Sequence, residues 1–117
     1  MNHNHVTPLQ AEMSHHKLRV WTKARSLVRL VSRVPIGDAE LRNQASRAAK
    51  SVGCNIAEGA ALDGASKKRH YKIARGSVIE VVAAYELAED CGEQVPVDEV
   101  TELARAIASM LTGLIRK

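Results

Sequence analysis

The sequence predicts an all-α fold, an up-down-up-down four-helix bundle, and three observations lead to that prediction. Apolar residues recur at steps of three and four in four successive stretches, and no stretch alternates for long at period two. The chain contains no Phe, one Trp and two Tyr among its 45% apolar residues, so Ala, Val, Leu and Ile in closely packed helices must form the core. The three prolines, Pro8, Pro35 and Pro96, all fall outside these stretches.

The first helix is expected over residues 16–33. Its apolar face comprises Val20, Ala24, Leu27, Val31 and Val34, widened by Trp21 and Val28. The arginines on its opposite face are Arg25, Arg29 and Arg33. Residues 1–15 show no sustained period and are expected to form a mobile lead-in to a single domain, residues 16–117. The histidines near the start (His3, His5, His15 and His16) are expected to bind metal only adventitiously, so no metal site is predicted.

The other three helices have recognisable start and stop signals. The second is expected over residues 38–58, with Asp38 as its N-cap and Gly59 as its C-cap. The third should begin with Ser66 as its cap and end near residue 91, where Gly92 can stop it. A turn through Pro96 leads to the fourth, over residues 98–116. This helix is expected to pack through Val100, Leu103, Ile107, Met110, Leu111 and Leu114. The short connections predict that successive helices run antiparallel.

The second helix carries a polar stripe directly beside its apolar one. The apolar stripe is Leu41, Ala45, Ala48, Val52 and Ile56, and the polar stripe is Gln44, Arg47, Ser51, Asn55 and Glu58. Because the apolar stripe is narrow and rich in Ala, another helix can approach closely and cover the polar stripe. Buried polar groups need hydrogen-bond partners, so the rest of the chain is expected to supply them.

The third helix supplies a candidate partner for this stripe. Its apolar core stripe is Ala74, Val78, Val81, Tyr85 and Ala88, and a second stripe is Ile73, Ser77, Glu80, Ala84 and Leu87. Antiparallel pairing about the 59–65 connection puts Arg47 level with the late 70s, near Glu80. A buried Arg47–Glu80 ion pair that fixes the register is therefore predicted. A catalytic role for Glu80 is the alternative, but no nucleophile or metal set accompanies it. The predicted structural polar core is Gln44, Arg47, Ser51, Asn55, Glu58, Ser77 and Glu80.

These stripes carry a family resemblance. Gln44-x-x-Arg47-Ala48-Ala49-x-Ser51, Asn55-Ile56-Ala57-Glu58-Gly59 and Ile73-Ala74-x-Gly76-Ser77-x-x-Glu80 resemble the bacterial four-helix-bundle proteins encoded in intervening sequences of 23S ribosomal RNA genes, the S23-type family. The resemblance spans nearly the whole chain from Leu18; Tyr71 stands where the family usually has Phe. It implies a four-helix bundle assembled as a homopentameric ring. It also implies kinship with accessory proteins of diversity-generating retroelements, which work with a reverse transcriptase and nucleic acid.

Charge is distributed unevenly along the chain. Residues 1–78 hold fourteen Lys/Arg and five Asp/Glu, a net +9, whereas residues 79–117 hold three and eight, a net −5; together they give +4. Such a chain can bind a polyanion with its first half, pair with its own second half across a subunit contact, or do both. A closed ring of five with a heterologous contact is expected from the resemblance and this split.

A basic run at the start of the third helix is the best local evidence for a ligand. Its residues are Lys67, Lys68, Arg69, Lys72 and Arg75, with Arg25, Arg29 and Arg33 as a possible second patch. Cations at a helix N-terminus oppose the macrodipole, so helix stability does not explain the run, whereas an RNA or DNA phosphate would. A solvated surface, or pairing with the acidic half of a neighbouring subunit, is the alternative. With three aromatic residues, phosphate contacts should outweigh base stacking.

The remaining features point away from enzymes and membranes. No nucleophile–base pair, metal set or Gly-rich phosphate loop is present, so the expected protein is not an enzyme and needs no cofactor. The alternative to nucleic-acid binding is an oligomeric scaffold for a protein partner such as a reverse transcriptase. No apolar run reaches the ~20 residues of a membrane span and no signal peptide is visible. A cytoplasmic protein is expected, with Cys54 and Cys91 as buried thiols.

Overall fold

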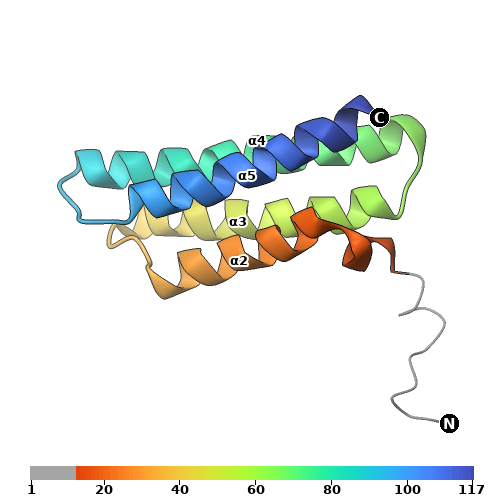
Figure 1. The fold of residues 1–117 in the computed structure, drawn as a ribbon. Coiled ribbons are helices and arrows are strands. Elements are labelled where there is room, and N and C mark those ends of the chain that lie inside the picture. Colours follow the sequence, from red (N-terminus) through yellow and green to blue (C-terminus); the bar gives the residue numbers. More distant parts are fainter. Residues whose placement is uncertain (1–12) are drawn as a thin grey trace, which may run out of the picture.

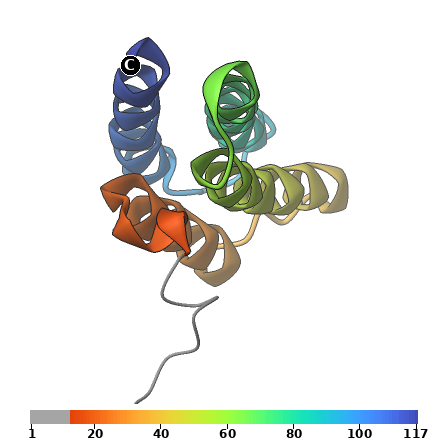
Figure 2. The ribbon, with the colours of Figure 1, turned by 90° about the vertical axis from the view of Figure 1, so that its right-hand side faces the viewer.

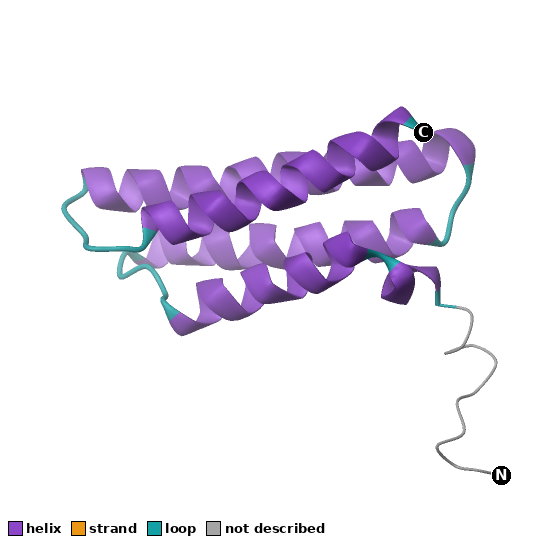
Figure 3. Cartoon of the chain, in the orientation of Figure 1, coloured by secondary structure: helices purple, strands orange, loops and turns teal. Residues whose placement is uncertain are grey.

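The structure, a computed structural model, describes residues 13–117 of the chain. A short 3₁₀ helix, η1 (Ser14–Lys17), precedes four α-helices. These are α2 (Arg19–Arg33), α3 (Ala39–Ala60), α4 (Gly64–Asp90) and α5 (Val97–Arg116). Figure 1 shows that each helix runs opposite to the one before it, which confirms the all-α four-helix prediction. Within the described residues there is no strand (Figure 3).

The four helices follow one another around a shared core (Figure 2). The closest association is between α3 and α4, and α2 and α5 lie against each other on the other side. The molecule is elongated, with extents of 53 × 35 × 21 Å. No helix in the described part of the chain combines the length and apolar character that crossing a bilayer requires.

The predicted apolar faces form the core. The buried side chains include Val20, Ala24, Leu27 and Val31 of α2; Ala45, Ala48, Val52 and Ile56 of α3; Ala74, Val78, Val81, Tyr85 and Ala88 of α4; and Val100, Ile107 and Leu111 of α5. Small residues dominate on α3, so α4 can pack closely against it. The steps of three and four residues in the sequence therefore identified the correct face of each helix.

The first helix begins later than predicted, at Arg19 instead of residue 16. Leu18 adopts an extended conformation, with φ −91° and ψ 129°, which separates η1 from α2. The 3₁₀ helix contacts both α2 and α3, so residues 14 and 15 belong to the folded part, not to the predicted lead-in. Residues 1–12 of that predicted lead-in, including His3 and His5, lie outside the described residues.

The N-terminus of α3 is capped from two directions. The Asp38 carboxylate accepts a hydrogen bond from Leu41 N at 2.9 Å, as predicted for an N-cap. Glu93, in the connection between α4 and α5, accepts from Gly37 N at 2.7 Å and from Asp38 N at 2.9 Å. Arg42 donates to the carbonyl of Gly37 at 2.8 Å. The α2–α3 and α4–α5 connections are thereby joined at one end of the bundle.

The connection between α3 and α4 is shorter than predicted. Helix α3 continues to Ala60, and α4 starts at Gly64 after the N-cap Asp63, so Ser66 is not the cap. Gly64 has φ +58°, a conformation that glycine adopts without steric cost. At the other end of α4, Gly92 has φ +94° and follows the C-cap Cys91, as predicted for a helix stop.

Gly59 lies inside α3 and is not its C-cap. A Cβ at this position would stand 2.8 Å from Cε1 of Tyr71 and 3.2 Å from the carbonyl oxygen of Lys67. The absence of a side chain therefore allows the end of α3 to lie directly against the first turns of α4. Tyr71, only 2% exposed, fills the space in front of the glycine.

Tyr85 links the core to the end of α2. Its side chain is completely buried, and its hydroxyl donates to the carbonyl oxygen of Val34 at 2.9 Å. Because Val34 is the C-cap of α2, this hydrogen bond satisfies one of the carbonyls that the helix leaves without an internal partner. Burial raises the pKa of both Tyr85 and Tyr71 above the ordinary value of 10.0.

The two cysteines correct another expectation. Cys54 and Cys91 were predicted to be buried thiols, but both are exposed and neither forms a disulfide. Cys54 follows the core residue Val52 by two positions, which places it about 200° around the helix, on the outer side. Cys91 is the C-cap of α4 and lies beyond the packed part of that helix.

Replacing Gly59 with Ala is expected to destabilise the fold by about 1–3 kcal/mol, because the new methyl group would displace the Tyr71 ring or separate α3 from α4. Gly113→Ala is the matched control, since a Cβ at Gly113 meets nothing within 4 Å, and that variant should gain about 0.5–1 kcal/mol. Urea unfolding followed by circular dichroism measures both. Equal midpoints for the two variants would contradict the tight contact at Gly59.

Stability is expected to fall at alkaline pH because of the two tyrosines. Their folded-state pKa lies above the unfolded value of 10.0, so the unfolded chain loses the phenolic protons first. The contribution of the two protonated tyrosines to the free energy of unfolding is therefore constant below pH 10, and it is lost as pH rises through the folded-state pKa. Denaturation midpoints measured across that range, together with tyrosinate absorbance, report it. Tyr85→Phe should lose about 1 kcal/mol at neutral pH and show a smaller alkaline decline; an unchanged decline would exclude Tyr85 as a source.

Candidate nucleic-acid interface

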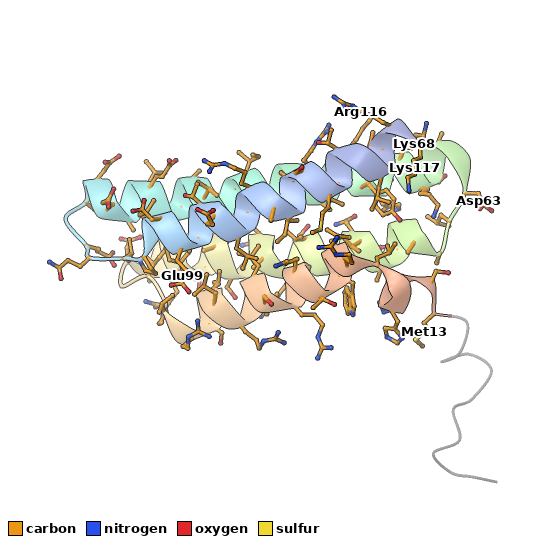
Figure 4. All side chains as sticks on the ribbon, in the orientation of Figure 1. Met13, Asp63, Lys68, Glu99, Arg116 and Lys117 are labelled. Atoms are coloured by element: carbon orange, nitrogen blue, oxygen red, sulfur yellow. The ribbon has the colours of Figure 1, made fainter. Side chains whose placement is uncertain are left out.

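The basic run and the C-terminus of α5 lie at the same end of the bundle. Because α4 and α5 are antiparallel neighbours, the start of one meets the end of the other. Figure 4 shows Lys68, Arg116 and Lys117 at that same end of the bundle. Arg116 and Lys117 were not among the predicted site residues. In the sequence they are visible only as two basic residues at the end of the fourth helix. Because that helix runs antiparallel to the third, its end must lie near the start of the third.

Two members of the basic run have structural partners. Lys67 donates through Nζ to the carbonyl oxygen of Ala60 at 3.4 Å, and its ammonium lies 5.6 Å from the centre of the Tyr71 ring. Arg75 donates to the Thr112 hydroxyl at 2.9 Å and so links α4 to α5. Both side chains are half-buried, and we assign them to the fold.

The other three members line an open hollow of about 460 Å³ on α4, formed by Ala65, Lys68, Arg69, Lys72 and Ile73. Arg69 and Lys72 are exposed, as are Arg116 and Lys117 on α5. We call Lys68, Arg69, Lys72, Arg116 and Lys117 the basic end. None of the ion pairs found within residues 13–117 involves any of these five side chains, so their charges are available to an external anion.

The dipole argument for the basic run needs a correction. Since α4 begins at Gly64 and not after Ser66, its first turn is Gly64, Ala65 and Ser66, and Lys67 begins the second turn. The macrodipole falls off within the first turn, so it opposes these charges less than expected. What makes the site electropositive is the convergence of cations from two helices. Arg116, in the last turn of α5, is also favourably placed for its own helix dipole.

The arginines of α2 do not form one free basic patch. Arg33 pairs with Glu99 at 3.9 Å, with both side chains largely exposed. Arg29 and Arg33 line a groove of about 740 Å³ between α2 and α5, whose other wall includes Asp98, Glu99 and Glu102. Arg25 lines a different groove, between α2 and α3, with Trp21 and Lys50. The carboxylates of α5 therefore partly neutralise this surface.

Charge is arranged along the long axis of the molecule. The end of α4 and the start of α5 carry most of the acidic residues of the second half of the chain: Glu86, Glu89, Asp90, Glu93, Asp98, Glu99 and Glu102. They lie at the opposite end from Lys68 and Arg116, as the position of Glu99 in Figure 4 shows. The first half of the sequence is basic and the second half is acidic. Along α4, this places basic residues at one end of the bundle and acidic residues at the other.

Part of the predicted polar core lies between α3 and α4. The hydroxyls of Ser51 and Ser77 are 2.9 Å apart. Asn55 donates to Ser51 Oγ at 3.1 Å, so Ser51 in turn can donate to Ser77. His70 Nδ1 lies 2.9 Å from Asn55 Oδ1; since that oxygen only accepts, Nδ1 is the donor. We call these four residues the α3–α4 seam. His70 was missed, although it precedes Ser77 by seven residues and so lies on the same helix face.

The predicted Arg47–Glu80 ion pair is absent, and this prediction was wrong. Both residues are exposed, and the ion pairs within the described residues do not include them. The reason is the small size of Ser51 and Ser77, which fill the seam. The longer side chains one turn away lie on its outer edge and extend into water, where neither charge is desolvated.

Gln44 and Glu58 are exposed as well. Glu58 Oε2 lies 3.9 Å from His70 Nε2, at the edge of the seam. Only Ser51, Asn55 and Ser77 of the seven predicted polar core residues are therefore covered within one chain: Ser77 is buried, and Ser51 and Asn55 are half-buried.

The fold and these surfaces define an all-α four-helix-bundle protein with a polar seam between its two most closely packed helices and a basic end. The family model described as 23S rRNA-intervening sequence protein matches residues 16–113, and the chain belongs to this family. The match begins in η1 and ends near the end of α5, so it includes α2, α3, α4 and most of α5. The resemblance inferred from the stripes of the second and third helices is thereby confirmed. No curated protein matches the chain.

Proposed function

We propose that this protein is a non-enzymatic homo-oligomer that binds RNA or DNA through phosphate contacts at its basic end. The observation that supports this most is the gathering of Lys68, Arg69 and Lys72 with Arg116 and Lys117, five cations from two helices without an ion-pair partner in residues 13–117. Placing like charges together costs free energy in the isolated protein. A polyanion removes that cost and releases its own counterions, which favours binding.

The chemistry of the basic end suits a phosphate backbone better than a base. The lining of the hollow on α4 contains no aromatic residue, so it offers no surface for base stacking. Lysine and arginine contacts to phosphates carry little sequence information. We therefore expect binding that depends strongly on salt and weakly on sequence. No cofactor is required for this role.

An oligomeric scaffold for a protein partner is the second candidate function. The acidic end, formed by the C-terminus of α4 and the N-terminus of α5, complements the basic end. Joining the basic end of one subunit to the acidic end of the next would use the same cations for ring assembly instead of nucleic acid. A reverse transcriptase, as the resemblance implies, or another protein would then bind the assembled ring.

We place the protein in the cytoplasm. Both cysteines of the chain are free and exposed, an arrangement suited to a compartment in which thiols stay reduced. An RNA or DNA ligand would also be available there.

Replacing Lys68, Arg69 and Lys72 with Gln is expected to weaken binding to duplex DNA and to RNA about equally for every sequence tested. The slope of log affinity against log salt should flatten by roughly 0.9 for each duplex phosphate that the variant no longer neutralises. The matched control replaces Arg25, Arg29 and Arg33 with Gln, which removes the same charge. It should weaken binding much less, because carboxylates of α5 already face Arg29 and Arg33.

Fluorescence anisotropy over a salt series measures both triple variants. Equal losses of affinity would mean that net charge, and not the basic end, determines binding. A wild-type protein that binds neither RNA nor DNA at low salt would reject the nucleic-acid function. If the α4 triple variant also changed the oligomeric state, the scaffold function would be supported instead.

The wild-type protein is expected to be a homo-oligomer at micromolar concentration, a closed ring of five with a heterologous contact between subunits. Multi-angle light scattering and sedimentation velocity give the mass, which should be five times the 12.7 kDa of one chain. A mass of 12.7 kDa at moderate salt would reject the oligomer. A stable assembly of another size would retain the oligomer and reject the ring of five.

A further inference from the structure

The groove between α2 and α3 combines an apolar lining with positive charge. Helices α2 and α3 lie side by side (Figure 1), and the groove between them has a volume of about 560 Å³. Its apolar lining includes Trp21, Ala24 and Gly53. Its cations are Arg25, Arg29 and Lys50. We call this site the α2–α3 groove.

Trp21 gives the α2–α3 groove an aromatic surface. The indole ring is half-buried and lies over Gly53, where an added Cβ would stand 3.5 Å from Cζ3 of the ring. The ring of His15 meets it edge-on, with the two ring centres 4.5 Å apart and an interplanar angle of 79°. These contacts hold the indole in place from two sides. The part of the ring that stays exposed can contact an apolar or aromatic molecule.

The cations of the α2–α3 groove lack an anionic partner there. Within the part of the chain that the structure describes, no carboxylate lines the groove. Trp21 lies opposite Gly53 in an antiparallel pair, so Arg25, four residues later, comes level with residue 49 and its neighbour Lys50. Neither Arg25 nor Lys50 takes part in an ion pair found within residues 13–117. Two like charges therefore lie at one level beside an apolar surface, which costs free energy until an anion binds.

We propose that the α2–α3 groove binds a small amphipathic anion, a molecule with an apolar or aromatic body and one carboxylate or sulfonate group. The body lies against Trp21, Ala24 and Gly53, and the acidic group accepts hydrogen bonds from Arg25 and Lys50. The volume of the groove falls in the range of small-molecule sites, which are mostly apolar with a few polar groups that fix the orientation of the ligand. This inference depends neither on nucleic-acid binding nor on an oligomer.

The surroundings of the groove favour a small ligand over a nucleic acid. Arg29 also lines the groove between α2 and α5, whose other wall carries the α5 carboxylates. A polynucleotide has a phosphate at every nucleotide, and these carboxylates would repel the phosphates that extend past Arg29. A ligand with a single charge can stay between α2 and α3, where it meets Arg25 and Lys50 and avoids the carboxylates.

The fluorescent probe 1-anilinonaphthalene-8-sulfonate tests the site, because it has an aromatic body and one sulfonate group. Trp21 is the only tryptophan of the chain, so quenching of its emission detects a probe that is bound near this groove. We expect saturable binding to the full chain with quenching of Trp21. An absence of binding, or binding that leaves the Trp21 emission unchanged, would overturn the proposal.

Charge removal locates the probe. Arg25→Gln together with Lys50→Gln should weaken probe binding at least about tenfold, because the sulfonate loses two charged hydrogen-bond donors. The matched control, Arg47→Gln with Arg105→Gln, removes the same charge from exposed residues that do not line the groove. It should change the Kd by less than about twofold, since salt screens distant surface charges. Equal losses in the two double variants would overturn the site.

Competing ligands define the chemistry that the groove recognises. Decanoate, with an apolar chain and one carboxylate, should displace the probe. Decanol, with the same chain and no charge, should be at least about tenfold less effective. Equal displacement by the two would show an apolar hollow without anion recognition and overturn the proposal. A short single-stranded DNA that displaced the probe at a lower concentration than decanoate would assign the cations to nucleic acid and overturn it as well.

Cys54 provides a readout that does not depend on fluorescence. Its exposed thiol lines the same groove, and Cys91→Ser leaves it as the only thiol of the chain. At about ten times the Kd of decanoate, the unoccupied fraction falls about tenfold, and the rate of Cys54 alkylation by N-ethylmaleimide should fall with it. Cys54→Ser is the matched control, in which decanoate should leave the alkylation of Cys91 unchanged. No protection of Cys54, or equal protection of Cys91, would overturn the proposal.

Discussion

The close approach of α3 and α4 is the constraint on which the rest of the structure depends. Gly59 allows it at one end, where the Tyr71 ring occupies the space that a side chain would fill. The Ser51–Ser77 contact maintains it in the middle of the pair. Because these residues are small, the long polar side chains of the same stripes remain outside, at the edge of the seam. The composition of the helix interface thus determines both the packing of the core and the chemistry of the outer surface.

The direction of the helices determines where charge accumulates. In an up-down bundle, the start of α4 adjoins the end of α5, so basic residues more than forty positions apart in the sequence (Lys68 and Arg116) lie at the same end. The acidic residues at the opposite ends of these two helices gather in the same way.

The faces of the helices could be predicted from the sequence, because steps of three and four residues directly report which side is apolar. The helix ends were less predictable: Ser66 and Asp63 are both good caps, and the choice between them depends on how closely α4 approaches Gly59. The ion pair of Arg47 and Glu80 was mispredicted because periodicity gives the direction of a side chain but not the depth of the seam beside it. Arg116 was overlooked because its neighbours come from another helix, which no local pattern reveals.

Glu93 joins two connections that are far apart in the sequence. Its carboxylate accepts from the amides of Gly37 and Asp38, so the α4–α5 connection holds the entrance of α3. Local opening of either connection breaks the same pair of hydrogen bonds and releases the other. We therefore expect this end of the bundle to open as one cooperative unit in hydrogen exchange.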